Sequence, residues 1–286
     1  MTTYLVHRSD NATSAAQAAR AFLESRPIEH NLILTLLRER IERPAPGRYW
    51  WVTESGVVRG VALRSPLAFK ATVTPMPLDA VGALVDAVAA DAPDLPGVSG
   101  EAATAATFAG AWTERRSSGA HPGEGQRIYR LDAARSPGGV PGSLRVADRE
   151  DLERLSVWFV AFQQTVGGNP PVDDVAGFLA GPVAERRFWV WEHDGEPVAA
   201  TMISSPIAGA ARISFVFTPP ERRSNGYATA MVAELCSRAL AADRPFGRVE
   251  ACLLYTQLHN ATANAIYRRI GFRAAAEVTV YEFDPP

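Results

Sequence analysis

One segment constrains the fold more than any other: an apolar run, a turn that begins with two prolines, and a helix with one apolar face. The run is residues 212–217, RISFVF, and the turn is residues 218–226, TPPERRSNG. From Met231 to Leu240 the apolar side chains recur every three or four residues, so the helix buries one stripe. A strand, a tight turn and a helix that packs back on the sheet predict a chain that mixes α and β elements.

A linker near the midpoint divides the chain. Residues 131–143, LDAARSPGGVPGS, contain two prolines, three glycines and almost no large apolar side chain. The length of 286 residues suits two domains. We therefore predict a first domain over 1–134, a linker over 135–142 and a second domain over 143–286.

The second half predicts a mixed sheet with helices. Asp148 is a candidate N-cap, with Asp151 three residues on, for a helix that follows a short strand. Residues 186–206 predict a β-hairpin around Asp194-Gly195. The predicted order is β, α, β, β, β, α, β, α, β, which is not a uniform βα repeat.

The first half repeats this pattern faintly. Its sequence predicts a hairpin around Gly56, a strand over 69–76 and a closing strand over 126–133. Helices are predicted at 13–25, 30–43, 78–92 and 102–116. The order of hairpin, strand, two helices and strand resembles the second half and indicates a diverged internal duplication.

The helix after the two prolines has an N-terminus suited to an anion. Its free N–H groups and the helix dipole favour negative charge. Gly226 lets the backbone approach a ligand without a Cβ, Ala228 keeps the first turn small, and Arg223 adds a guanidinium. These properties fit a pyrophosphate. An ordinary turn that uses Gly and Asn for its geometry is the alternative.

A second polar cluster lies on a short helix, within LLYTQLHNATANAIYRRIGF. Asn260 is a natural N-cap and Gly271 a natural stop. Asn260, Asn264 and Tyr267 share one helix face. A polar stripe beside a buried strand favours a helix that lines a cleft, because a core must satisfy each polar group. A surface helix with a capping asparagine is the alternative.

Together the two segments resemble the GCN5-related N-acetyltransferase (GNAT) superfamily. Its signature of Arg or Gln, two residues, Gly, one residue and Gly or Ala is matched by RSNGYA, Arg223 to Ala228. The family's earlier turn is matched by FVFTPPE and its later helix by NATANAIYRRIGF, so the resemblance covers residues 143–284. Ser224 departs from the family, which often has glycine there, and we expect a slightly tighter loop. Tandem arrangements of this kind occur among bacterial members.

The resemblance implies an α+β (mixed α/β) fold of two tandem GNAT-like lobes, the fold of acyl-CoA N-acyltransferases. Each lobe would have a mixed, largely antiparallel central sheet flanked by helices. The first half has no counterpart of the signature after residues 69–76. We therefore expect a degenerate N-terminal lobe, without cofactor, and a catalytic C-terminal lobe.

The implied activity is transfer of the acetyl group of acetyl-CoA to a primary amine, by direct attack in a ternary complex. The cofactor would lie in a V between residues 212–217 and 248–255, and Tyr267 matches the family tyrosine that protonates the leaving thiolate. The expected cofactor-binding residues are Phe215, Val216, Phe217, Arg223, Ser224, Asn225, Gly226, Tyr227, Ala228, Thr229, Asn260, Asn264 and Tyr267.

Two other functions fit the same motifs: a non-catalytic acyl-CoA-binding sensor or partner module, and an acyltransferase that uses a longer acyl-CoA. Tyr267 favours an enzyme, because a sensor needs no acid for a leaving group. No general base stands out, since Glu101, Glu192 and Glu250 each fit a surface or structural carboxylate. The aromatic run over 158–163 fits core packing or a wall of the acceptor site.

Composition narrows the partners. A net charge of −2 gives no support for a nucleic-acid or anionic-membrane partner. Cys236 and Cys252 lie in apolar patterns that predict buried thiols, and the five histidines lack metal-ligand spacing, so no metal is expected. Without a basic leader or a long apolar run, we expect a cytoplasmic protein. The expected partner is a small-molecule or peptide amine, and the expected state is a monomer or homodimer.

Overall fold

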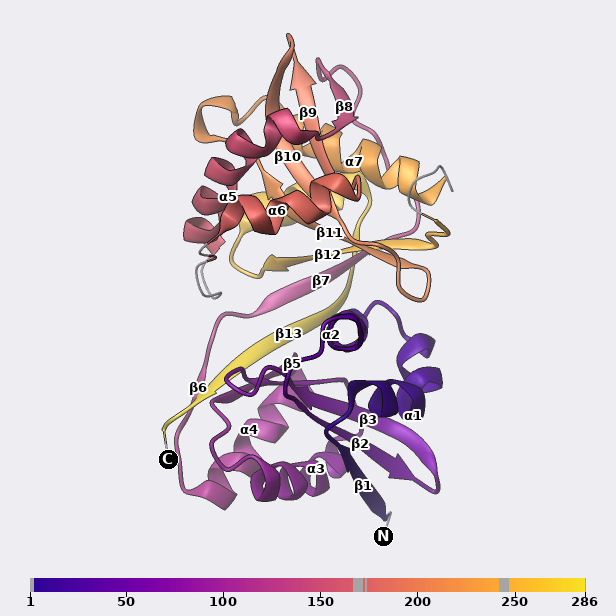
Figure 1. Ribbon diagram of the computed structural model, residues 1–286, viewed down its shortest axis with the longest axis vertical. Helices are drawn as coiled ribbons and strands as arrows, with labels where there is room; N and C mark the ends of the chain where they lie inside the picture. Colours follow the sequence, from indigo (N-terminus) through magenta and orange to yellow (C-terminus); the bar gives the residue numbers. More distant parts are fainter. Residues whose placement is uncertain (1–2, 167–171, 173, 242–246, 286) are drawn as a thin grey trace. The chain divides into compact units, whose positions relative to one another are not determined.

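The structure, a computed structural model, describes residues 3–166, 172, 174–241 and 247–285 (Figure 1). The chain divides into two units. Unit 1 comprises Met1–Ile128, Thr256–His259 and Ala274–Pro286, and unit 2 comprises Tyr129–Tyr255 and Asn260–Arg273. Among the described residues, no helix has the length and apolar character needed to cross a membrane.

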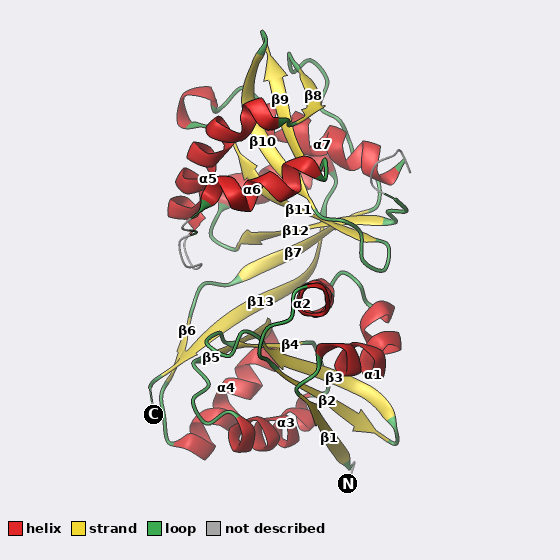
Figure 2. Cartoon of the chain, in the orientation of Figure 1, coloured by secondary structure: helices red, strands yellow, loops and turns green. Residues whose placement is uncertain are grey.

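Unit 1 is a mixed sheet covered by helices on both faces (Figure 2). Its strands are, in spatial order, β1 (Tyr4–Ser9), β2 (Arg48–Glu54), β3 (Val57–Arg64), β4 (Ala71–Val73), β5 (Gly97–Glu101) and β13 (Arg273–Phe283), with β6 (Ala120–Pro122) beside β13. The pair β4 and β5 is parallel and the other pairs are antiparallel. The helices are α1 (Ala12–Ser25), α2 (Asn31–Glu42), α3 (Leu78–Asp91) and α4 (Ala102–Arg116).

Alternation along the strands divides the core of unit 1 in two. Tyr49 and Leu63 pack against α1 and α2, whereas their neighbours Trp50 and Ala62 pack against α3 and α4. Successive side chains of a strand point to opposite faces, so one hairpin supplies both clusters.

Unit 2 has the same architecture. Its strands are, in spatial order, β7 (Gln126–Leu131), β12 (Ala251–Gln257), β11 (Ala210–Phe217), β10 (Glu196–Ile203), β9 (Phe188–His193) and β8 (Ser143–Val146). Of these, β11 and β12 are parallel. One face packs on α5 (Leu152–Val166) and α6 (Val175–Ala184), and the other on α7 (Tyr227–Leu240) and α8 (Ala261–Ile270). Cys236 and Cys252 are buried on the α7 side, as expected.

The two units repeat one order of elements, which supports the predicted duplication. From β1 to α4 and from β8 to α8 the order is strand, two helices, three strands, helix, strand, helix. In both units the parallel pair lies between the fourth and fifth strands of the repeat. The predicted fold of two lobes with mixed, helix-flanked sheets is confirmed. The prediction for the second half missed α6.

The units differ from the predicted domain boundaries at the strand that closes each repeat. The strand after α8 is β13, and it pairs with β5 in unit 1 through Val278–Glu282. The end of β7, from Tyr129, lies in unit 2, where Tyr129 and Leu131 join the core. The composition of the linker correctly indicates a break between strands. It does not indicate the sheet to which each neighbouring strand belongs.

Candidate active site

The parallel strands β11 and β12 separate partway along their length. They pair over Ala210–Arg212 and Ala251–Leu253, and the register stops there although both strands continue. Beyond Arg212, β11 therefore pairs with no described residue along the edge that faces β12. Its backbone N–H and C=O groups there are available to an extended ligand, as at a sheet edge.

A β-bulge shapes the free part of β11. Phe215 has a φ of 51°, and the pairing with β10 shifts register between Ala200 and Met202. Ile213 packs on the α7 side, whereas Phe215 and Phe217 pack on the α5 side. The bulge therefore breaks the alternation within the segment where the cofactor was expected.

The aromatic residues of α5 pack around this bulge. The ring centroids of Phe159 and Phe162 lie 5.6 and 5.1 Å from that of Phe215, and Trp158 lies 5.9 Å from Phe217. Trp158 is itself buried. These contacts agree with the core-packing alternative for the aromatic run, and they hold the bulge against α5.

The turn between β11 and α7 leaves a helix N-terminus without a side-chain cap. A short 3-10 turn, Pro220–Arg222, is followed by Ser224 and Gly226, whose φ angles are 66° and 81°. The N-cap of α7 is Gly226, and no side chain bonds to the first N–H groups of the helix. Uncapped N–H groups and the helix dipole give an anion-binding site in the place the sequence indicated.

The side chains of Asn225 and Arg223 stabilise the turn by hydrogen bonds to its own backbone carbonyls. The Asn225 amide donates to the carbonyls of Arg222 and Arg223 at 3.1 and 3.0 Å. The Nε of Arg223 donates to the Thr218 carbonyl at 3.0 Å, while the rest of this exposed guanidinium is free for an anion.

Just beyond the turn, α7 begins with inward-facing side chains. Tyr227 and Thr229 are buried, and the Tyr227 hydroxyl lies 3.1 Å from Nδ1 of His193. Contacts of Tyr227 and Thr229 with a ligand would therefore come through their backbone groups.

Ser224 occupies a left-handed backbone conformation, which explains the family's preference for glycine there. A non-glycine residue in this region is strained by its Cβ. We expect Ser224→Gly to raise the free energy of unfolding by about 0.5–1 kcal/mol and to leave acetyl-CoA affinity unchanged within about twofold. Denaturant unfolding and calorimetric titration measure the two effects. A less stable variant would contradict the strain.

Both asparagines of α8 make hydrogen bonds within the protein. Asn260 Oδ1 accepts from the Ala263 N–H at 3.0 Å. Asn264 is buried, accepts from the Tyr129 hydroxyl at 2.9 Å and donates to the Asn260 carbonyl at 2.7 Å. Sequence reasoning missed Tyr129, which comes from β7 in the first half of the chain.

Tyr267 lies in the core between α8 and the sheet. Its ring packs edge-on against Phe272 and tilts toward Tyr129, with centroid distances of 5.8 and 6.2 Å. Burial raises the pKa of its hydroxyl above the ordinary value, so the phenol stays protonated at neutral pH. In the described part of the chain, the Tyr267 hydroxyl is not among the side-chain polar atoms that are sealed from solvent without a hydrogen bond. The group is a proton donor held by packing.

All three candidate carboxylate bases have structural roles. Glu192 pairs with Arg145 at 2.5 Å, and Glu250 with Arg248 at 2.9 Å. Glu101 caps α4 by accepting from the backbone N–H groups of its first turn. These contacts agree with the expectation that each is a surface or structural carboxylate.

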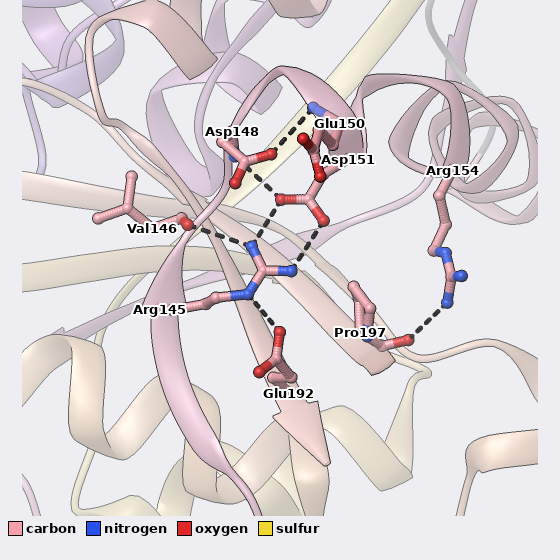
Figure 3. A network of polar contacts seen from close by, with 8 residues as sticks. All are labelled: Arg145, Val146, Asp148, Glu150, Asp151, Arg154, Glu192 and Pro197. Carbon is pink, nitrogen blue, oxygen red and sulfur yellow. Dashed lines mark hydrogen bonds and ion pairs between the residues drawn. The ribbon is translucent and has the colours of Figure 1, made fainter. Parts of the chain in front are cut away.

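The Arg145 network joins β8, β9 and the turn before α5 (Figure 3). Arg145 donates to both carboxylate oxygens of Asp151, at 2.7 and 3.0 Å, and to Glu192 on β9. Asp151 also accepts from the Asp148 N–H at 2.9 Å and so completes the predicted capping box. Burial acts to raise the pKa of Asp151, but the hydrogen bonds from Arg145 and Asp148 outweigh it and lower the pKa.

Removing the charge of Asp151 should destabilise the chain. We expect Asp151→Asn to lower the free energy of unfolding by about 2 kcal/mol at pH 7, because Arg145 loses its buried partner. Because the folded pKa is depressed, this contribution is present above the unfolded pKa of about 4 and is lost as the pH falls below it. Denaturant unfolding from pH 7 to pH 3 measures the difference. A difference independent of pH would contradict the ion pair.

The geometry in unit 2 coincides with a family match. Residues 153–272 match the acetyltransferase (GNAT) family. Unit 2 carries a GNAT acetyltransferase domain. The match includes the parted strands, the uncapped helix α7 and Tyr267, and it ends at Phe272, one residue before β13. Enzymes of this family transfer acyl groups from acyl-CoA donors.

Solved GNAT structures resemble the whole chain. A GNAT acetyltransferase from Colwellia psychrerythraea has 12% identity and a TM-score of 0.63, with 98% of this chain and 100% of that chain covered. A GCN5-related N-acetyltransferase from Sphaerobacter thermophilus has 15% identity, a TM-score of 0.66 and coverage of 99% and 96%. A tandem GNAT protein from the clavulanic acid biosynthesis pathway has 11% identity, a TM-score of 0.55 and coverage of 99% and 98%. At these identities the likeness establishes the fold. No curated protein is a significant match to the sequence.

Proposed function

We propose that the chain is an N-acetyltransferase that moves the acetyl group of acetyl-CoA to a primary amine by direct attack in a ternary complex. The observation that carries this proposal is the parting of β11 and β12 after Arg212, beside the uncapped N-terminus of α7. One feature suits an extended amide-bearing arm and the other a pyrophosphate. Both lie within the GNAT match.

In this proposal acetyl-CoA runs along β11. The backbone of Phe215–Phe217 pairs with the pantetheine amides, and the N–H groups of Arg223–Thr229 hold the pyrophosphate. The guanidinium of Arg223 adds charge. Asn260 and Asn264 act indirectly, because their side chains are engaged within α8 and with Tyr129. Their role is to fix the helix that carries Tyr267.

The chemistry needs a neutral amine and an acid for the leaving group. An aliphatic amine with a pKa of about 10.4 costs roughly 4–5 kcal/mol to deprotonate at pH 7. A base or a water chain takes that proton. The amine nitrogen then bonds to the thioester carbon, the C–S bond breaks, and Tyr267 gives its proton to the thiolate. The nitrogen loses its second proton to solvent as the amide forms, and a solvent proton restores the phenol. Its raised pKa keeps that proton in place before the reaction.

Unit 1 contributes no second cofactor site in this proposal. Its parallel strands stay paired as far as Val73 and Gly100, directly before the Glu101 cap of α4. A Cβ at Gly100 would lie 2.7 Å from the Val73 carbonyl oxygen, so these strands are in close contact. No signature follows β4. We propose that this lobe binds no cofactor of its own.

The acceptor in this proposal is a small-molecule or peptide amine in the cytoplasm. Neither nucleic acid nor membrane is a partner, and the protein works as a monomer or homodimer. An acyl-CoA sensor and an enzyme for longer acyl-CoA remain the alternatives. A phenol kept protonated by burial favours the enzyme over the sensor.

Free CoA release, measured across an amine panel, tests the proposal. The panel contains amino sugars, polyamines, amino acids and peptides, each with acetyl-CoA and with longer acyl-CoA donors. We expect amine-dependent release with acetyl-CoA. Tight binding without turnover on any amine would support the sensor, and failure to bind CoA would overturn the proposal.

A further inference from the structure

A half-buried arginine lies where the two parallel strands begin to part. Arg212 pairs with Leu253 in the last rung of the β11 and β12 ladder. Side chains opposite each other in a parallel pair share a face, and every second residue shares it too. Arg212 and Tyr255 therefore lie on one face at the vertex of the parted strands.

This face is the one that α5 and α6 cover. The alternating neighbours Ala211, Ile213, Cys252 and Leu254 pack on the α7 side. Arg212 and Tyr255 are thus on the opposite face, together with Phe215 beyond the bulge. Both side chains are half-buried.

Arg212 differs from comparable arginines in having no carboxylate partner. In the described part of unit 2 the other half-buried arginines are Arg145, Arg187 and Arg238, and each pairs with an acidic side chain. No ion pair or side-chain hydrogen bond to a described residue engages the Arg212 guanidinium. Charged groups are rarely buried in proteins without a partner.

Tyr255 adds a neutral donor beside this charge. Burial raises the pKa of Tyr255 to about 12, and the positive charge of Arg212 acts in the opposite direction. The phenol is therefore protonated at neutral pH. A guanidinium only donates hydrogen bonds, and a neighbouring phenol can donate one more, so together they match the acceptor oxygens of a carboxylate.

The vertex is also where the reacting end of the proposed cofactor lies. The pyrophosphate site follows the carboxyl end of β11, so the arm runs back along the strand. From Ile213 to Phe217 the strand rises four residue steps, about 13 Å at roughly 3.3 Å per step, and the pantetheine arm would follow this stretch. The acyl group and the attacking amine then meet next to Arg212.

We propose that Arg212 and Tyr255 form a carboxylate subsite at the vertex of β11 and β12, so that one of the two reactants carries a carboxylate. This inference rests on the proposed function. The carboxylate belongs either to the acceptor, as in an amino acid or peptide, or to the acyl group, as in a dicarboxylic acyl-CoA. In both cases the guanidinium fixes that reactant beside the thioester.

Matched probes separate the two sources. In the first arm, β-alanine, 4-aminobutyrate, α-amino acids and glycyl peptides are compared with their carboxamides, using acetyl-CoA. In the second, succinyl-CoA is compared with acetyl-CoA on an amine without a carboxylate. Each probe is measured by kcat/KM and by calorimetric Kd with wild type, Arg212→Gln and Arg212→Lys. Arg149→Gln is the control, because it removes the same charge from an exposed, unpaired arginine.

We expect wild type to prefer the carboxylate in one arm by at least about tenfold, in turnover or in binding. Arg212→Gln should lose this preference, Arg212→Lys should keep part of it, and Arg149→Gln should keep all of it. Acetyl-CoA affinity should be unchanged in all three. The inference would be overturned if wild type used the probes with and without a carboxylate equally in both comparisons, or if the preference survived in Arg212→Gln. In either case, binding of acetyl-CoA by wild type would leave the proposed function standing. Failure of wild type to bind acetyl-CoA would overturn both.

Discussion

Gly226→Glu is expected to weaken acetyl-CoA binding at least about 100-fold. The substitution places a carboxylate at the N-cap of α7, among the N–H groups that the pyrophosphate would need. The φ of 81° also strains any side chain there, and a Cβ would lie 3.2 Å from Val140 Cγ2. Calorimetric titration with acetyl-CoA measures the loss.

Gly195→Glu is the matched control for this experiment. Gly195 has a φ of 76° in the β9–β10 turn of the same unit, and no atom lies within 4 Å of its Cβ position. The control carries the same charge and a similar strain, so it should bind acetyl-CoA like wild type. If Gly226→Glu and Gly195→Glu bound acetyl-CoA with equal affinity, the N-terminus of α7 would not be the anion site.

Tyr267→Phe is expected to lower kcat about 10²- to 10³-fold and to leave acetyl-CoA affinity nearly unchanged. The substitution keeps the ring that packs against Phe272 and removes only the proton donor. Steady-state CoA release gives kcat, and titration gives the affinity. Leaving groups of lower pKa need less help from an acid, so a more acidic thioester donor should show a smaller loss.

Tyr281→Phe is the control for the phenol. Tyr281 lies on β13, in unit 1, where it pairs with β5. We expect this variant to turn over like wild type. An unchanged kcat in Tyr267→Phe would show that another group, or water, protonates the thiolate.

Local signals in the sequence predicted local structure well. The capping box at Asp148 and Asp151 formed where spacing placed it, and the hairpin turn fell at Asp194-Gly195. Each depends on residues within a few positions of one another, so the sequence alone is sufficient. The uncapped start of α7 at Gly226 belongs to the same class.

Features that depend on distant segments could not be predicted. Strand β13 follows α8 of unit 2 in the chain but pairs with β5 of unit 1, and no local pattern in its sequence encodes that partner. Tyr129 meets Asn264 although 135 positions separate them. The bulge at Phe215 depends on β10 and α5, because an apolar run carries no signal for the residue at which alternation breaks.

The same limit applied to the two asparagines of α8. Their spacing correctly placed them on one helix face, but the partner that satisfies Asn264 comes from β7. A polar stripe on a buried helix has two physical solutions, a ligand or a distant side chain. The sequence did not indicate the contact with Tyr129, and ligand binding by the two asparagines stays a prediction.

A crystal structure of the chain with acetyl-CoA would show where the cofactor binds. We expect the pyrophosphate within hydrogen-bond distance of the N–H groups of Arg223–Thr229. We also expect the pantetheine amides paired with β11 beyond Arg212 and the thioester sulfur near the Tyr267 hydroxyl. A cofactor bound between β4 and β5, or anywhere away from the parted strands of unit 2, would contradict the proposed site.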